Sequence, residues 1–253
     1  MPPTVTLIGI EGLPDIRPGD DLAGQIVAAA RAQETPLADG DVLVVTQKVV
    51  SKSEGRLVRL VEVVPSPLAV EFADAWEKDA RVVEVVLREA KRVVRMENGV
   101  LITETRHGFR CANSGVDASN VGPESEETVA LLPLDPDASA GGIRRVVMET
   151  AGVTVGVVIS DTFGRPWREG AANVAIGVAG LEALWDYRGA PDIYGRELHS
   201  TTIAVVDELA AAAELVTNKL TRVPVAIVRG YSFQPGDSGI APLIREAAKD
   251  LFR

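Results

Sequence analysis

The stretch "VVISDTFGRPWREGAANVAIG", residues 157–177, starts as a buried strand and then changes character. Residues 157–159 are apolar and β-branched, as is typical of the interior of a sheet. The polar residues Ser-Asp-Thr, 160–162, follow at once, although a turn would need only Gly164 and Pro166. We therefore expect a strand that ends at residue 160 and a functional loop after it.

The carboxylate of Asp161 admits two interpretations. The carboxyl end of a buried strand is where open sheets place their ligands, which favours a functional role. Alternatively, Asp161 is the N-cap of the next element, and Arg165 and Arg168 lie on the surface. The stretch alone leaves both interpretations open.

The chain around this stretch mixes strand-like and helix-like segments that do not alternate as regular βαβ units. Strands are predicted at residues 4–10, 42–45, 153–160 and 223–231, with a hairpin in 99–120. Helices are predicted at 21–33 with Asp20 or Asp21 as N-cap, in 67–96 as two helices that break near 78–79, after Asp137 or Ser139, in the second half of 200–220, and at 240–252. The sequence predicts an α+β (mixed α/β) fold in a single domain, 1–253, with room for two subdomains.

The chain is acidic, with 36 Asp and Glu against 26 Lys and Arg and a net charge of −10. Such a chain lacks the broad attraction that nucleic-acid binding needs, so we expect no nucleic-acid partner. The single cysteine, Cys111, excludes an internal disulfide and a multi-cysteine metal site. The N-terminus does not resemble a signal peptide, and no apolar run approaches the ~18–20 residues of a membrane span. We therefore expect a cytoplasmic protein that does not enter a membrane.

Several common catalytic motifs are absent from the sequence. It has no phosphate-binding P-loop, no dinucleotide fingerprint, no His-Glu-x-x-His motif and no nucleophile elbow. His107 and His199 are the only histidines, which excludes a His-rich metal site. Oxygen ligands and cations near strand ends remain as the candidate chemistry.

The segment "NSGVDASN", residues 113–120, offers a second carboxylate, Asp117. By itself it reads as a solvated turn. If the fold brings Asp117 close to Asp161, two carboxylates ~4 Å apart repel by about 4 kcal/mol at a typical effective dielectric constant. A divalent cation such as Mg²⁺ or Mn²⁺ removes that repulsion, and the hydroxyl of Thr162 adds a further oxygen ligand. The two segments together predict a metal site that binds phosphate groups.

Two further segments carry clustered polar residues. In "TQKVVSKSEGR", 46–56, Lys48 and Lys52 are four residues apart in what we predict to be a turn, so the segment is either a cradle for a polyphosphate or an ordinary basic turn. The segment "DIYGRELHSTT", 192–202, is either a substrate lid or an exposed loop with a subunit contact. Within it, Glu197 and His199 are candidate general bases.

These motifs occur in the order seen in the CofE-type coenzyme F420-0:L-glutamate ligases, and the chain resembles that family from about residue 5 to 232. The combination of Asp-Ala-Ser-Asn at 117–120, Asp-Thr-x-Gly-Arg at 161–165 and Tyr-Gly-Arg-Glu-Leu at 194–198 is specific. The resemblance implies the stand-alone form, without a C-terminal nitroreductase-like domain. It also implies a fold that is neither a P-loop nor an ATP-grasp architecture.

The resemblance implies an activity as well. Members of the family add L-glutamate to coenzyme F420-0, and then further γ-linked glutamates, at the expense of GTP and through an acyl phosphate. The implied partners are GTP, F420-0 and L-glutamate, and the implied cofactors are two divalent ions, Mg²⁺ or Mn²⁺; whether K⁺ assists is open. The family is dimeric, and we expect the apolar run 174–184 to be exposed and available for a homodimer contact.

The resemblance also assigns residues. It implies that one divalent ion is bound by Asp117 and Asp161 and a second by Thr162. Family members use the stretch at 216–223 for nucleotide and second-metal contacts, but here it reads "VTNKLTRV", without a carboxylate, so Lys219 either replaces a cation or contacts a phosphate. The implied nucleotide contacts are Leu13, Pro14, Asp15, Ile16, Gln47, Lys48, Lys52, Asn120 and Lys219, and the residues expected to offset charge in catalysis are Lys52, Arg165 and Arg168.

Two other functions fit the same residues. A metal-dependent phosphohydrolase could use the same two aspartates and the threonine, and a nucleotide- or coenzyme-binding module would use them without catalysis.

Overall fold

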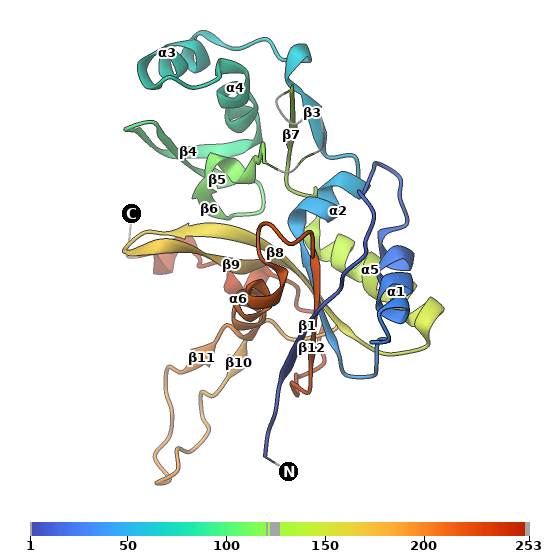
Figure 1. The fold of residues 1–253 in the computed structure, drawn as a ribbon. Helices are drawn as coiled ribbons and strands as arrows, with labels where there is room; N and C mark the ends of the chain where they lie inside the picture. Colours follow the sequence, from blue (N-terminus) through green and yellow to red (C-terminus); the bar gives the residue numbers. More distant parts are fainter. Residues whose placement is uncertain (1, 120, 122–126, 251–253) are drawn as a thin grey trace.

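The computed structural model describes residues 2–119, 121 and 127–250 (Figure 1). Its centre is a five-stranded sheet in the order β1-β12-β2-β8-β9, in which β2 and β8 are parallel and the other neighbours are antiparallel. The strands are β1 (Thr6–Gly9), β2 (Val42–Thr46), β8 (Gly156–Arg165), β9 (Arg168–Ala179) and β12 (Val225–Arg229). The prediction of an α+β fold is confirmed, and neither a P-loop nor an ATP-grasp arrangement is found in the described part.

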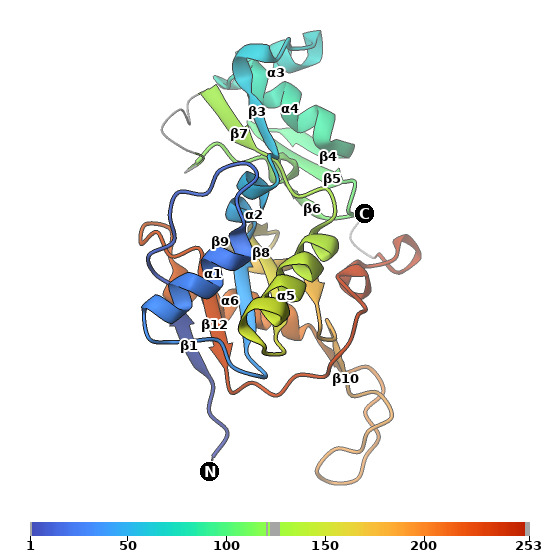
Figure 2. The same cartoon turned by 90° about the vertical axis from the view of Figure 1, so that its right-hand side faces the viewer.

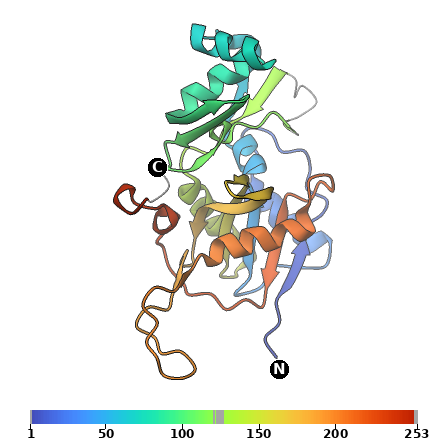
Figure 3. The same ribbon diagram turned by 90° about the vertical axis from the view of Figure 1, so that its left-hand side faces the viewer.

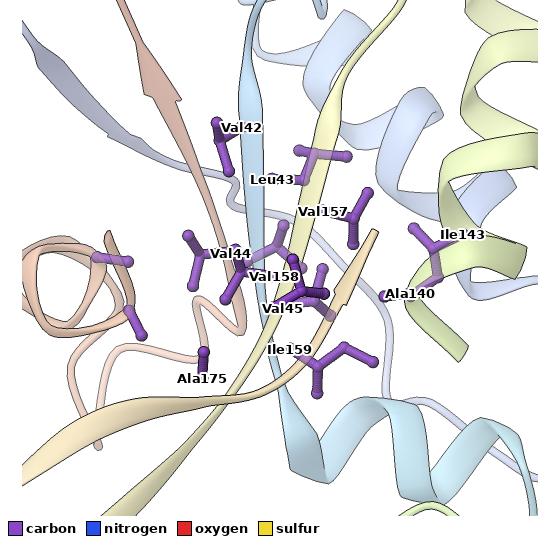
Figure 4. Packing of buried hydrophobic residues seen from close by; sticks show 14 of the residues in the cluster. Val42, Leu43, Val44, Val45, Ala140, Ile143, Val157, Val158, Ile159 and Ala175 are labelled. Carbon is purple, nitrogen blue, oxygen red and sulfur yellow. The ribbon is translucent and has the colours of Figure 1, made fainter. Parts of the chain in front are cut away.

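Helices cover both faces of this sheet. Figure 2 shows α1 (Leu22–Ala32) and α5 (Pro136–Ala151) on one face, and Figure 3 shows α6 (Val205–Thr217) across the other. Because both faces are covered, the central strands are continuous apolar runs rather than alternating ones. Leu43 and Val157 lie on the side of Ala140 and Ile143 of α5, and Val44 lies on the opposite side (Figure 4). Each such buried side chain contributes about 1.5–3 kcal/mol.

Aspartates begin the two helices on the α5 face. Asp21 caps α1, since its carboxylate accepts a hydrogen bond from Gly24 N at 3.0 Å, as predicted. Asp135 caps α5 through Ala138 N, also at 3.0 Å, with Pro136 in the first turn. Helix α5 therefore begins earlier than predicted, because proline is well suited to a first turn, where its missing N–H has no helical partner.

Gly177 of β9 allows α5 to pack closely on the sheet. A Cβ atom at this position would lie 2.4 Å from the carbonyl oxygen of Pro136, which is backbone and cannot move aside alone. Gly177→Ala should therefore destabilise the fold by about 1–3 kcal/mol, which for a chain of this size lowers the Tm by roughly 2–10 °C.

The matched control is Gly141→Ala, in helix α5, where an added Cβ meets no atom within 4 Å. It should stabilise the fold by about 0.5–1 kcal/mol, because alanine is the better helix former. Thermal unfolding of both variants checks the pair, and equal shifts in the same direction would contradict the close approach of α5 to β9.

A smaller group of elements packs above the end of the sheet (Figure 1). We call these elements the small lobe: β3 (Leu57–Arg59), the turn η1 (Leu60–Glu62), α3 (Pro67–Trp76), α4 (Ala80–Glu89), β4 (Ala90–Glu97), β5 (Val100–Thr105), β6 (Arg110–Ala112), the turn η2 (Asn113–Gly115) and β7 (Thr128–Ala130). Strands β4-β5-β6 form one sheet and β3-β7 a second. Two apolar clusters separate from the main core lie here, one around Phe72, Val86 and Leu101 and one around Leu60, Val85 and Val129.

Outside the opening stretch, three sequence predictions about secondary structure are wrong. Residues 90–97 form β4 instead of extending the second helix, because pairing with β5 overrides their helical spacing. Segment 46–56 is mostly helical: α2 spans Gln47–Ser53. The C-terminal segment is not an α-helix in its described part, up to residue 250, and contains only the turns η4 (Ala241–Leu243) and η5 (Ala247–Lys249). Pro242 has no backbone N–H to donate to a helical hydrogen bond. The backbone N–H of Ile240 donates to Oδ1 of Asp137, 3.1 Å away.

The apolar run 174–184 is also not exposed. Residues 175–178 are buried in β9, between α5 and α6, so this run cannot supply the predicted homodimer contact. A homodimer would need another surface. Among the helices that the structure describes, none combines the length and the apolar character needed to cross a membrane.

Candidate functional site

The opening stretch does not end its strand at residue 160. Strand β8 continues to Arg165 and pairs with β9 as a long hairpin. The parallel neighbour β2 ends at Thr46, which lies opposite Ser160, so Asp161 is the first residue of β8 beyond that partner. Asp161 is therefore neither in a loop nor an N-cap; it is a strand residue placed where the buried sheet gives way to polar surroundings.

Helix α2 begins where β2 ends and places two lysines on one face. Lys48 and Lys52 are one helical turn apart, so their side chains project in similar directions. Lys52 is almost fully buried and its Nζ lies 2.5 Å from Oδ1 of the exposed Asp15. The segment 13–16 is held beside α2 by its apolar members: Ile16 is fully buried and Leu13 packs against the core, while Pro14 is exposed.

Gln47 is buried and bound within the protein. Its Nε2 donates to Ser51 Oγ at 2.6 Å and to the carbonyl oxygen of Leu131 at 3.1 Å. The bond to Leu131 fixes α2 against the segment that follows β7. The contact of Gln47 with a nucleotide stays a prediction.

Lys48 contacts Asp117, the other aspartate that is predicted to bind a metal ion. Its Nζ lies 2.7 Å from Oδ2 of Asp117 and 2.5 Å from the carbonyl oxygen of Ser119. Oδ1 of Asp117 accepts hydrogen bonds from Ser119 N at 2.7 Å and Ser119 Oγ at 2.8 Å. Burial raises the pKa of Asp117, but these bonds and the charge of Lys48 outweigh it and hold that pKa below its usual range. The predicted contact Asn120 lies outside the described residues.

Asp161 and Asp117 lie close enough to influence each other. Burial raises the pKa of Asp161 to about 6, and the negative charge of Asp117 adds to this. The hydrogen bond from Thr162 N, 2.8 Å from Oδ1, and the charges of Lys219 and Lys48 act in the opposite direction. The fold thus brings Asp117, Asp161, Lys48 and Lys219 into one electrostatic site.

The hydroxyl of Thr162 belongs to a chain of hydrogen bonds that the sequence did not reveal. It accepts from Lys219 Nζ at 2.9 Å and donates to Asn173 Oδ1 at 2.7 Å, and Asn173 Nδ2 in turn donates to Glu214 Oε2 at 2.8 Å. Asn173 is the cross-strand neighbour of Thr162 in the β8–β9 hairpin, and Glu214 comes from α6. The hairpin register brings Thr162 to Asn173, and the placement of α6 and of the loop after it adds Glu214 and Lys219.

The donors of the site fit a hard divalent cation. Two carboxylates and a hydroxyl are the oxygen ligands that Mg²⁺ and Mn²⁺ prefer. The described residues contain no group of three or more His, Cys, Asp or Glu side chains that could hold a metal ion. An ion bound by Asp117 and Asp161 would therefore complete its coordination with water and phosphate oxygens, as Mg²⁺ usually does.

A sequence model of the F420-0:Gamma-glutamyl ligase family matches residues 11–230. The chain belongs to this family. Coenzyme F420:L-glutamate ligase of Methanothermobacter thermautotrophicus is 45% identical over 252 residues, covering 98% of this chain and 99% of that protein. The proteins of the same name from Methanocaldococcus jannaschii (42% over 250 residues, 98% and 97%) and Methanopyrus kandleri (47% over 243 residues, 94% and 93%) are similar along nearly their whole lengths. The family resemblance read from the motifs is confirmed.

Two arginines assigned by family resemblance lie apart from the aspartates. Arg165 and Arg168 face each other across the hairpin tip, four strand residues or about 13 Å beyond Asp161. Arg165 donates to the carbonyl oxygens of Gly170, at 3.0 Å, and Glu169. Within this chain the structure does not bring these guanidinium groups to Asp161.

The two candidate general bases also lie elsewhere. His199 and Glu197, 3.6 Å apart, are exposed in the long loop between β10 (Trp185–Asp186) and β11 (Thr202–Ile203). That loop projects from the end of the molecule opposite the small lobe (Figures 1 and 3). Within one chain, neither side chain reaches the site of Asp161.

A surface depression of the described part lies away from the charged residues around Asp161. It measures about 490 Å³, lies between α1, α2 and α5, and includes none of the residues discussed above as ligands. Its acidic side chains Asp21 and Asp135 already cap helices. The depression therefore contains none of the predicted metal ligands, and the site around Asp161 stays a prediction.

Proposed function

We propose that the chain is a GTP-dependent ligase that joins L-glutamate to coenzyme F420-0 and then adds further γ-linked glutamates. The observation that carries the proposal is the convergence of Asp117, Asp161, Lys48 and Lys219, from four separate segments, on the end of the β2–β8 pair. The printed names of the relatives, coenzyme F420:L-glutamate ligase, support the choice of substrates. GTP is proposed from family resemblance.

The reaction needs an activated carboxylate. An oxygen of the F420-0 carboxylate attacks the γ-phosphorus of GTP, and the bond to the β-γ bridging oxygen breaks, which gives an acyl phosphate and GDP. The glutamate nitrogen then attacks the acyl carbon, inorganic phosphate departs with the C–O electron pair, and the nitrogen loses a proton to form the amide. In this scheme the protein positions two anions and offsets their charge.

Different residues of the chain would bind the metal ion and contact the phosphates. Asp117 and Asp161 would hold a divalent ion, which when bound neutralises and polarises the phosphate oxygens. Lys52, almost fully buried beside segment 13–16, offers an ammonium group to the phosphates. Lys219 follows Asp161 in the sequence, whereas Lys48 precedes it. Its ammonium donates a hydrogen bond to Thr162 and adds a further positive charge.

Lys219→Met should raise the KM for GTP about 10-fold, because a charge-assisted hydrogen bond from an exposed lysine to a phosphate contributes about 1.5 kcal/mol, the lower end of the usual range. Steady-state kinetics with GTP as the varied substrate checks this. Arg222→Gln removes a charge from an exposed residue of the same loop and should change the KM less than twofold. Equal effects of the two substitutions would show that only the net charge of the loop matters.

Incubation of the purified chain with GTP, Mn²⁺, L-glutamate and F420-0, followed by mass spectrometry, tests the function. A product heavier by one or more glutamate residues supports the ligase. Release of GDP at a rate that ignores F420-0 would instead indicate a phosphohydrolase, and tight binding without turnover would indicate a binding module.

A further inference from the structure

Both oxygens of the Asp117 carboxylate already have protein partners. Oδ2 pairs with Lys48 Nζ at 2.7 Å, and Oδ1 accepts two hydrogen bonds from Ser119. Lys48 is held in turn by the carbonyl oxygen of Ser119 at 2.5 Å and its hydroxyl at 3.1 Å. Both side chains of the ion pair are mostly shielded, with 19% of Lys48 and 34% of Asp117 exposed. This shielding makes the pair stronger than a typical surface pair.

Asp161 differs in this respect. Its Oδ1 accepts one hydrogen bond, from the adjacent Thr162 N, and it forms no ion pair with any residue in the described part of the chain. The nearby Lys219 donates to the hydroxyl of Thr162 instead. Of the two aspartates, Asp161 has fewer protein partners, whereas a cation that approaches Asp117 meets the ammonium group of Lys48.

An ammonium group and a divalent ion beside the same carboxylate oxygen repel each other, so Lys48 in its present position opposes the binding of a divalent ion at Oδ2 of Asp117. The flexible four-carbon stem of Lys48 allows its ammonium to move. Lys48 also lies on the same face of α2 as Lys52, one turn away, so a nucleotide phosphate beside Lys52 would be an alternative anion within its reach.

We propose that Lys48 is an internal counter-cation that Asp117 exchanges for a divalent ion, and that Lys48 transfers to the nucleotide phosphates as they arrive. This Lys48 exchange rests on the proposed function, which supplies the nucleotide and the metal. The ion alone must break the Lys48–Asp117 pair without offering Lys48 a new partner. With nucleotide present, the released lysine gains a phosphate contact, so each ligand favours binding of the other by the same factor.

Binding of Mn²⁺ alone tests the exchange, because it can be measured without turnover from the electron paramagnetic resonance signal of the free ion. Lys48→Met keeps most of the apolar stem and removes the charge. It should bind Mn²⁺ at least about 10-fold more tightly than the unmodified chain when no nucleotide is present. Addition of GDP should then enhance its Mn²⁺ affinity by a smaller factor than in the unmodified chain.

Lys52→Met is the matched control. It also removes one positive charge, one helical turn from Lys48, but Lys52 pairs with Asp15 and not with Asp117. Its affinity for Mn²⁺ alone should stay within about threefold of the unmodified chain. Lys48→Arg, which keeps a cation beside Asp117, should retain the weak Mn²⁺ binding and serves if the methionine variant fails to fold.

Two results would overturn the exchange and leave the metal site intact: Lys48→Met binds Mn²⁺ alone no more tightly than the unmodified chain, or Lys52→Met gains as much. If neither the unmodified chain nor these variants bind Mn²⁺ even with saturating GDP, the proposed metal site itself is wrong, and the exchange with it. Circular dichroism and thermal unfolding confirm that each variant is folded.

Discussion

Replacement of Asp161 by asparagine should abolish the metal-dependent binding of GTP and leave the chain folded. Loss of an outer partner of a metal ligand typically costs 10–100-fold in affinity, so loss of a ligand itself should cost more than about 100-fold. The stability should not fall. Burial holds the pKa of Asp161 at about 6, so the folded state disfavours its ionised form at every pH above the usual carboxyl pKa. At pH 8, without metal, the asparagine variant should therefore unfold at an equal or higher temperature.

Calorimetric titration of GTP with Mn²⁺, together with thermal unfolding, checks both parts. Asp207→Asn is the matched control, because burial also raises the pKa of Asp207, whose carboxylate accepts from Ala175 N at 2.9 Å. This control should bind GTP and Mn²⁺ normally. Undiminished affinity for GTP with Mn²⁺ in the Asp161 variant would remove the basis of the proposed site.

The second large effect is expected at Lys52. The Lys52 side chain is 8% exposed and its described partner, Asp15, is 64% exposed, so the fold holds the ammonium beside a carboxylate that faces solvent. Lys52→Met should lower kcat/KM for GTP by about 10- to 100-fold, which corresponds to one charge-assisted hydrogen bond. The Tm should change little, because methionine fills the space of the lysine stem.

Lys91→Met provides the comparison. Lys91 pairs with Glu104 at 3.2 Å in the small lobe and is well exposed, so its loss should change kcat/KM less than twofold. Kinetics with GTP as the varied substrate distinguishes the two. If Lys52→Met is as active as Lys91→Met, the positive charge of α2 does not hold the nucleotide.

Much of the central sheet could be predicted from the sequence. The apolar runs at 42–45 and 223–231 are too short and too rich in β-branched residues for helices, and both are strands. The helix at 21–33 carries its own start signal, Asp21. The sequence also suggests one cation site for Asp117 and Asp161, because both acidic motifs follow apolar stretches; the negative charge of Asp117 does act on Asp161, and the shared cation stays a prediction.

Other features depend on contacts that a single sequence does not display. The strand of Asp161 extends past residue 160 because β9 continues to pair with it after β2 has ended. Residues 90–97 are a strand only because β5 lies beside them. Asn173 and Glu214 join Thr162 through the register of the hairpin and the placement of α6, and neither is encoded in a local motif.

The two aspartates belong to different parts of the molecule, and this has a mechanical consequence. Asp117 is hydrogen-bonded, backbone to backbone, with Ala130 at the end of β7 in the small lobe, whereas Asp161 is built into the main sheet. An ion bound by both aspartates would link the small lobe to the main sheet. Binding of a divalent ion by Asp117 and Asp161 should therefore slow amide hydrogen exchange in both β7 and β8. It should also make the chain between the small lobe and the main sheet more resistant to proteolysis.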